Sequence, residues 1–190
     1  MKIFTSALKS FSISFVSLTL VFLGIYGAVQ QDLRQSANDP QTELAENAAA
    51  YLTSNSAFGA GNSSQLNLTN KVNLGTSLST FIGVYDNNLK LFVTNAMLNN
   101  QDAIIPEGVL QTAVNDGRNT VTWQPQPGLR FAVVAVSFEK DGKKWVAVSG
   151  RSLRLVEERI DRIGLMLLIG YLLTLVAVFA AIYLKKLSSK

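Results

Sequence analysis

Residues 129–150 read LRFAVVAVSFEKDGKKWVAVSG, and this stretch decides the fold of the middle of the chain. Two apolar runs, 129–138 and 144–150, are joined by KDGK, whose Asp-Gly pair is a strong signal for a tight hairpin turn. The first run is apolar at consecutive positions. We therefore expect a strand that is covered on both faces and is central in an antiparallel sheet.

Three further runs upstream predict strands of the same sheet. FIGVYD (81–86) and LKLFVTN (89–95) surround an Asn-rich turn, and TVTWQ (120–124) alternates between polar and apolar residues. Before them, residues 58–70 are rich in Gly, Ser and Asn and predict a loop. The sheet is therefore expected to have about five strands.

Two segments of the same region predict helices. One lies within Gln30–Ser56, where Asp39 before Pro40 is a helix start signal. A shorter one runs from Ile105 to Asn115 and is followed by Asp-Gly, a common helix end. A long helix along an antiparallel sheet predicts an α+β fold.

Two uncharged blocks lie on either side of this region. Residues 11–29 and 163–184 each approach or exceed the ~20 helical residues that cross a bilayer. We expect both to be transmembrane helices, with short ends at 1–10 and 185–190 and a folded domain at 30–162 between them.

The distribution of charge predicts an orientation. Five of the 17 Lys and Arg residues lie outside residues 30–162, and all 13 Asp and Glu residues lie within them. By the positive-inside rule, both ends are expected in the cytoplasm and residues 30–162 outside a plasma membrane. The net charge of +4 is thereby explained without a nucleic-acid partner, and we expect none.

The first block also fits the apolar core of a secretory signal peptide. Its length exceeds the usual ~7–15 residues, and Tyr26 and Ala28 occupy the positions where a small-residue cleavage site would be required. An uncleaved signal anchor is the preferred interpretation, and cleavage stays an open alternative. The middle segment is exported in either case.

The composition argues against catalysis and metal binding. The chain has no Cys and no His, which excludes thiolate nucleophiles, the common metal ligands and the commonest general base. No Gly-rich phosphate loop and no complete nucleophile elbow is present. We expect a protein that is not an enzyme and that carries no cofactor or metal.

The order of elements, with FIGVYDNNLKLFVTN (81–95) and LRFAVVAVSF (129–138), resembles a known family. It is similar to the extracytoplasmic PAS-like sensor domains, also called Cache or PDC domains, of bacterial transmembrane receptors and sensor histidine kinases. The resemblance covers about residues 30–184, including the position between two spans. It implies signal transduction, for example in a two-component system. Such receptors continue into an output module, whereas only residues 185–190 follow the second span here.

A heptad pattern runs from the end of the domain through the second span. Its positions are spaced alternately by three and four: Leu153, Val156, Ile160, Ile163, Leu167, Gly170, Thr174, Ala177, Ala181 and Leu184. The pattern predicts one continuous helix that couples the domain to partner helices, in a homodimer or with another membrane signalling protein. Packing of the two spans against each other within one chain explains the spacing equally well.

Candidate ligand-binding residues are the aromatic and charged side chains that the predicted sheet could gather: Tyr85, Asp86, Trp123, Arg130 and Lys144. An aromatic floor with a cation suits a small carboxylate or other organic anion. The alternative, which the residue types favour, is that the aromatic residues belong to the core. Asp86 would then cap a turn, and the two cations would be solvated.

We expect from these features a membrane-anchored sensor or input module, which passes ligand or partner binding to the membrane through the helix at 151–184. Two alternatives stay open. One is a structural or accessory membrane subunit whose outer domain only binds another protein. The other is the sensor half of a longer histidine kinase.

Overall fold

The computed structural model describes residues 2–54, 66 and 68–188. The chain forms two compact units. One is Arg34–Val156, and the other combines Met1–Leu33 with Glu157–Lys190. The loop predicted at 58–70 lies for the most part outside the described residues.

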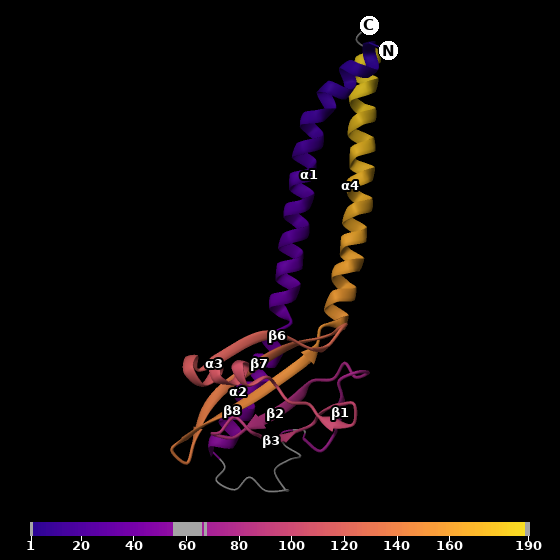
Figure 1. Ribbon diagram of the computed structural model, residues 1–190. Helices are drawn as coiled ribbons and strands as arrows, with labels where there is room; N and C mark the ends of the chain where they lie inside the picture. The colour runs from indigo at the N-terminus through magenta and orange to yellow at the C-terminus, as the bar shows by residue number, and fades with distance from the viewer. Residues whose placement is uncertain (1, 55–65, 67, 189–190) are drawn as a thin grey trace. The chain divides into compact units, whose positions relative to one another are not determined.

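The Arg34–Val156 unit is built on an antiparallel sheet with the strand order β3-β2-β8-β7-β6 (Figure 1). Its strands are β2 (Phe81–Tyr85), β3 (Leu91–Thr94), β6 (Arg118–Gln126), β7 (Leu129–Lys140) and β8 (Lys143–Ser152). The five predicted strands are confirmed, and β6, β7 and β8 extend beyond their predicted ends. The doubly apolar strand β7 lies inside the sheet, but the central position that the sequence predicts for it is held by β8.

The turn between β7 and β8 has the geometry that its sequence predicts. Asp141 has φ 52° and Gly142 has φ 71°, and the flanking residues Lys140 and Lys143 pair across the hairpin. Positive φ at both central residues is the requirement of a type I′ turn, which Asp-Gly meets at low cost. The turn therefore fixes the register of the longest hairpin in the sheet.

Helices cover both faces of this sheet. On one face, Ala48 and Leu52 of α2 (Asp39–Ser54) pack in one buried cluster with Val84 of β2. On the other face, Leu110 of α3 (Glu107–Asp116) shares a cluster with Phe131 of β7. Successive side chains of a strand point to opposite faces, so two covered faces explain why consecutive residues of β7 are buried.

A second, smaller sheet lies on the α3 side and is absent from the sequence prediction. Its strands are β1 (Val72–Asn73), β4 (Ala96–Leu98) and β5 (Gln101–Asp102), in the order β1-β4-β5. Each has only two or three residues, which is too short to show an alternating pattern. Val72 and Ala96 join the same buried cluster as α3.

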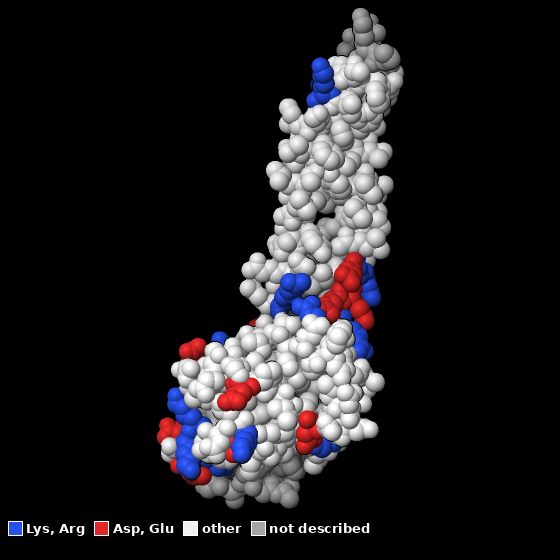
Figure 2. Space-filling model, viewed as in Figure 1, with Lys and Arg blue, Asp and Glu red and all other residues white. Residues whose placement is uncertain are grey.

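The second unit consists of α1 (Lys2–Ser36) up to Leu33 and α4 (Arg154–Ser188) from Glu157. Both helices are long and apolar enough to cross a membrane. In Figure 2 the long middle stretch of this helix pair carries neither basic nor acidic colour. The predicted helical region 30–56 thus contains the end of α1, a turn, and α2, which begins at Asp39 as predicted.

The two long helices pack against each other within the chain. They run side by side in opposite directions, and the start of α1 lies beside the end of α4 (Figure 1). There the Lys186 ammonium donates hydrogen bonds to the hydroxyls of Ser6 at 2.7 Å and Ser10 at 2.8 Å. The ring of Phe179 also packs edge-on against Phe11, with centroids 5.4 Å apart. Both ends of the chain therefore belong to the same end of the helix pair.

Candidate functional site

The predicted heptad seam is half-buried within the chain along the first part of α4 and exposed further on. Ile163, Leu167, Gly170 and Thr174 are half-buried, as a helix contact requires. Further on, Ala177, Ala181 and Leu184 are exposed, and their neighbours Val178 and Ile182 are half-buried instead. The reason is geometric: a straight helix of 3.6 residues per turn drifts by about 20° per heptad away from a strict seven-residue pattern. This part of the predicted seam does not face α1.

The half-buried face of α4 contacts α1 of the same chain. A Cβ atom placed on Gly164 would lie 3.2 Å from Cε2 of Tyr26, and one on Gly170 would lie 3.8 Å from Cε1 of Phe22. The small residues therefore let aromatic rings of α1 approach the backbone of α4. Packing within one chain accounts for this part of the seam, and the homodimer stays a prediction.

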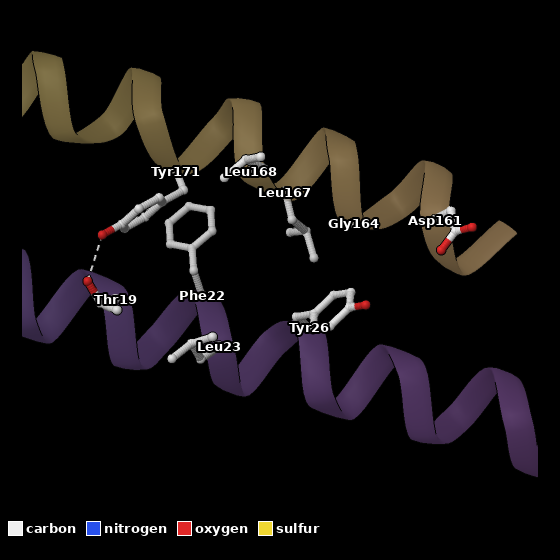
Figure 3. A pocket seen from close by; sticks show the side chains of 9 residues that line it. All are labelled: Thr19, Phe22, Leu23, Tyr26, Asp161, Gly164, Leu167, Leu168 and Tyr171. Carbon is white, nitrogen blue, oxygen red and sulfur yellow. Dashed lines mark hydrogen bonds between the residues drawn. The ribbon is translucent and has the colours of Figure 1, made fainter. Parts of the chain in front are cut away.

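Between α1 and α4 lies a cavity of roughly 450 Å³, with aromatic side chains of both helices in its walls (Figure 3). The cavity is lined by Thr19, Phe22, Leu23, Tyr26, Asp161, Gly164, Leu167, Leu168 and Tyr171. At one end the hydroxyls of Thr19 and Tyr171 are hydrogen-bonded at 2.7 Å. At the other end stands the carboxylate of Asp161. The sequence pattern identified Gly170 on this face, but neither Gly164 nor the cavity.

Two of the five predicted ligand residues are part of the sheet core. Tyr85 is buried, and its hydroxyl accepts a hydrogen bond from the backbone N–H of Ile105 at 2.8 Å. Burial raises the pKa of Tyr85 to about 12, although that hydrogen bond acts to lower it. The Trp123 ring packs against Phe131, with centroids 5.8 Å apart. These two side chains pack in the core, as the alternative interpretation of the aromatic candidates expects.

Two of the charged candidates stabilise a turn and a helix end. Oδ1 of Asp86 accepts hydrogen bonds at 2.9 Å from the backbone N–H groups of Asn88 and Lys90, which caps the β2–β3 turn. The Lys144 ammonium donates to the carbonyl of Val114 at 2.8 Å, near the end of α3. A cation there also interacts favourably with the helix dipole.

Arg130 lies on the other side of the sheet from the aromatic candidates. It precedes Phe131, which shares a cluster with Tyr85 and Trp123, and neighbouring residues of a strand point to opposite faces. The structure thus does not gather the five predicted residues at one place. Whether any of them contacts a ligand stays a prediction.

A polar hollow in the Arg34–Val156 unit brings together residues that are distant in sequence. Its volume is roughly 390 Å³, and it is lined by Asn70, Lys71, Val72, Ser77, Leu78, Ser79, Thr80, Asn95 and Arg151. Two cations, three hydroxyls and two amides are the groups that bind a small carboxylate or another organic anion. The ligand class expected from sequence therefore finds suitable residues here, at other positions than predicted.

The walls of the hollow are fixed by hydrogen bonds. Asn95 is almost fully buried; its side-chain oxygen accepts from the N–H of Ile82 at 2.8 Å and its carbonyl accepts from Val72 at 2.7 Å. Lys71 donates to the Thr94 carbonyl at 3.0 Å and pairs with Asp102 at 2.9 Å. These contacts hold β1, β2 and the segment after β3 in place around the opening.

Arg151 is, like Lys71, an exposed cation of this hollow, and the sequence offered only a weak signal for it. It lies on β8, close to where that strand ends at Ser152. Its positive charge was visible, but its neighbours in the hollow belong to residues 70–80 and to Asn95. Only the fold reveals that these residues meet.

Among the described residues, no group of three or more Asp or Glu side chains is placed to hold a metal ion. The Asp39, Glu43 and Glu46 side chains do line a third hollow, of roughly 500 Å³, beside Arg118. There Arg118 and Glu46 approach to 3.6 Å, and both are exposed. Exposed pairs of this kind contribute about 0–1 kcal/mol to stability.

No protein-family model matches this chain, and the search of curated proteins finds no relative of it.

Proposed function

We propose that this chain is a membrane-anchored sensor, or input module, of signal transduction. The Arg34–Val156 unit is its extracytoplasmic, PAS-like domain, and both ends of the chain are cytoplasmic. A small organic anion binds in the polar hollow, and α4 carries the response to the membrane. The observation that carries the proposal is the position of Arg151, which lines the hollow on the strand that leads into α4.

The connection between hollow and helix is short and well anchored. Leu153 alone separates β8 from α4; it is buried, and its N–H donates to the carbonyl of Arg130 at 2.8 Å. In the first turn of α4, the Arg154 guanidinium donates to the carbonyl of Gly75 at 3.2 Å. Gly75 lies shortly before the residues Ser77 to Thr80 that wall the hollow. A ligand that reorders this wall would therefore act on the start of α4.

The strand that leads into α4 is also the middle strand of the sheet. β8 pairs with β2 on one side and with β7 on the other, so a shift of β8 involves the whole sheet. A ligand changes such an equilibrium only by binding one state more tightly than the other. Two arrangements of β8 in the sheet whose free energies differ by a few kcal/mol are sufficient for a switch of this kind.

The order of elements supports the PAS-like assignment. A helix, a hairpin, a short helix, three strands and an exit helix follow one another along the chain, as in the layout that carries the resemblance. The small β1-β4-β5 sheet is an addition to that layout. The coupling role of α4 is supported by its unbroken course from Arg154 to Ser188.

Thermal unfolding of the full chain in detergent, against a panel of small carboxylates, tests the proposal. A ligand at about 100 times its Kd adds about 2.7 kcal/mol to the stability of the state that binds it, which raises Tm by several degrees. Arg151→Ala is expected to abolish this shift. Arg118→Ala, which also removes an arginine from a strand of this sheet, is the control and should preserve it.

Two outcomes would contradict the proposal. One is the absence of any ligand-dependent shift, and the other is a shift that Arg151→Ala leaves intact. A stoichiometric partner protein that co-purifies whatever small molecule is present would then favour the accessory-subunit function.

A further inference from the structure

The cavity between α1 and α4 has the properties of a ligand site in its own right. Its volume of roughly 450 Å³ is in the range of pockets that hold a small organic molecule. Its walls are apolar and aromatic, and Phe22, Tyr26 and Tyr171 project between the helices (Figure 3). Among these, Phe22 and Tyr171 are in ring contact, with centroids 5.4 Å apart.

The two ends of this cavity differ chemically. At the Tyr171 end, the hydroxyls of Thr19 and Tyr171 form a hydrogen bond with each other at 2.7 Å. At the Asp161 end there is an exposed carboxylate, and no described residue forms a hydrogen bond or an ion pair with it. A molecule that fills the cavity thus meets one negative charge, at one end of an apolar trough.

Two features near Asp161 favour a cationic partner. The Tyr26 ring lies close to the α4 backbone at Gly164, within one turn of Asp161, and aromatic faces attract organic cations. Asp161 is also the charged member of the cavity lining, since the other eight lining residues are uncharged. The apolar walls in turn favour a ligand with an apolar body.

We propose that this cavity binds a single-chain amphiphile with an ammonium head group. The ammonium group pairs with Asp161 beside the Tyr26 ring, and the apolar chain lies between Phe22 and Leu167 toward Tyr171. The occupant is a single-chain molecule because roughly 450 Å³ is the volume of a pocket for a small organic molecule and is too small for a two-chain lipid. This binding is independent of the hollow around Arg151 and stands whether or not that hollow senses an anion.

Equilibrium binding of radiolabelled dodecyltrimethylammonium to the full chain, in nanodiscs of digalactosyldiacylglycerol, a neutral lipid without an ammonium group, tests the proposal. Asp161→Asn is expected to raise the Kd about tenfold, since hydrogen-bonded or paired charges of this kind contribute that much or more. Asp161→Glu should retain most of the affinity. Glu158→Gln is the matched control: it removes the same charge from the same helix, outside the cavity lining, and should change the Kd less than about twofold.

Three results would overturn the proposal. The first is an equal loss of affinity in Asp161→Asn and Glu158→Gln, which would show only general attraction to an acidic surface. The second is equally tight binding of the neutral analogue dodecanol. The third is displacement of the probe by phosphatidylethanolamine in the nanodisc, which would make a two-chain lipid the occupant. Circular dichroism of each variant confirms that its helices are formed.

Discussion

Gly150 shows how closely the core of the outer unit is packed. A Cβ atom at this position would lie 2.3 Å from Cζ and 2.5 Å from Cε1 of Phe81, the residue paired with it on β2. The Phe81 ring cannot easily move away, because it packs against Trp123 and Phe131. Glycine is required here for the space it leaves.

Gly150→Ala is therefore expected to lower the free energy of unfolding by about 1–3 kcal/mol, the usual cost of overpacking a core. Gly108→Ala is the control: Gly108 lies in α3 with no atom within 4 Å of its added Cβ. In a helix this change stabilises by about 0.5–1 kcal/mol. Thermal unfolding of both variants measures the difference, and shifts of the same sign would contradict the packing described.

The raised pKa of Tyr85 predicts that the free energy of unfolding depends on pH. Its pKa is about 12 in the folded chain and about 10 in the unfolded chain. Between these values the unfolded state has lost the proton and the folded state has kept it, so the free energy of unfolding falls as pH rises. The loss from this group amounts to about 3 kcal/mol over the two units.

Tyr85→Phe removes this titration and also leaves the buried N–H of Ile105 without its partner. We expect the variant to be less stable by about 1–3 kcal/mol near neutral pH. We also expect the gap between the two proteins to shrink from pH 10 to pH 12. Unfolding followed by tryptophan fluorescence over this range measures it, and a gap that is constant with pH would rule out a buried phenol.

At the scale of elements, strong local signals predicted strands and helices well. The Asp-Gly pair correctly predicted the β7–β8 hairpin, where both turn residues have positive φ. The consecutive apolar residues of β7 correctly predicted a strand that is buried on both faces. Strands β1, β4 and β5 were missed because they are too short to show a pattern. The later positions of the heptad pattern turn away from α1, since a straight helix drifts away from a seven-residue repeat, and their contact with a partner helix stays a prediction.

The pairing of α1 with α4 can be tested by chemical cross-linking, because the chain has no Cys of its own. Phe11 and Phe179 are in ring contact across the pair, so a short bis-maleimide is expected to join cysteines at both positions within one chain. Electrophoresis under non-reducing conditions distinguishes this product from a dimer. The single variant Ala181→Cys, on the exposed face, is the companion: interchain cross-linking there would support the predicted homodimer. Absence of the intrachain product from the double variant would contradict the observed helix pair.

At the scale of the whole molecule, the candidate site was the part least accessible to sequence. The aromatic residues chosen as a pocket floor proved to be core, and Arg130 lies on the opposite face of the sheet from them. The polar hollow instead joins Lys71 to Arg151, which only the register of β1, β2 and β8 brings together. Residue type predicts the chemistry of a ligand, whereas the place where suitable residues meet depends on contacts between distant segments.

The central claim is that the Arg34–Val156 unit and the two chain ends lie on opposite sides of a membrane. Single cysteines test it in a background that has none. Asn87→Cys lies in the exposed β2–β3 turn, and Ser188→Cys is the last residue of α4. In intact bacterial spheroplasts, a membrane-impermeant maleimide is expected to label the cysteine at position 87 and to reach that at 188 only after lysis. Labelling of both positions in intact spheroplasts, or of neither, would contradict the account.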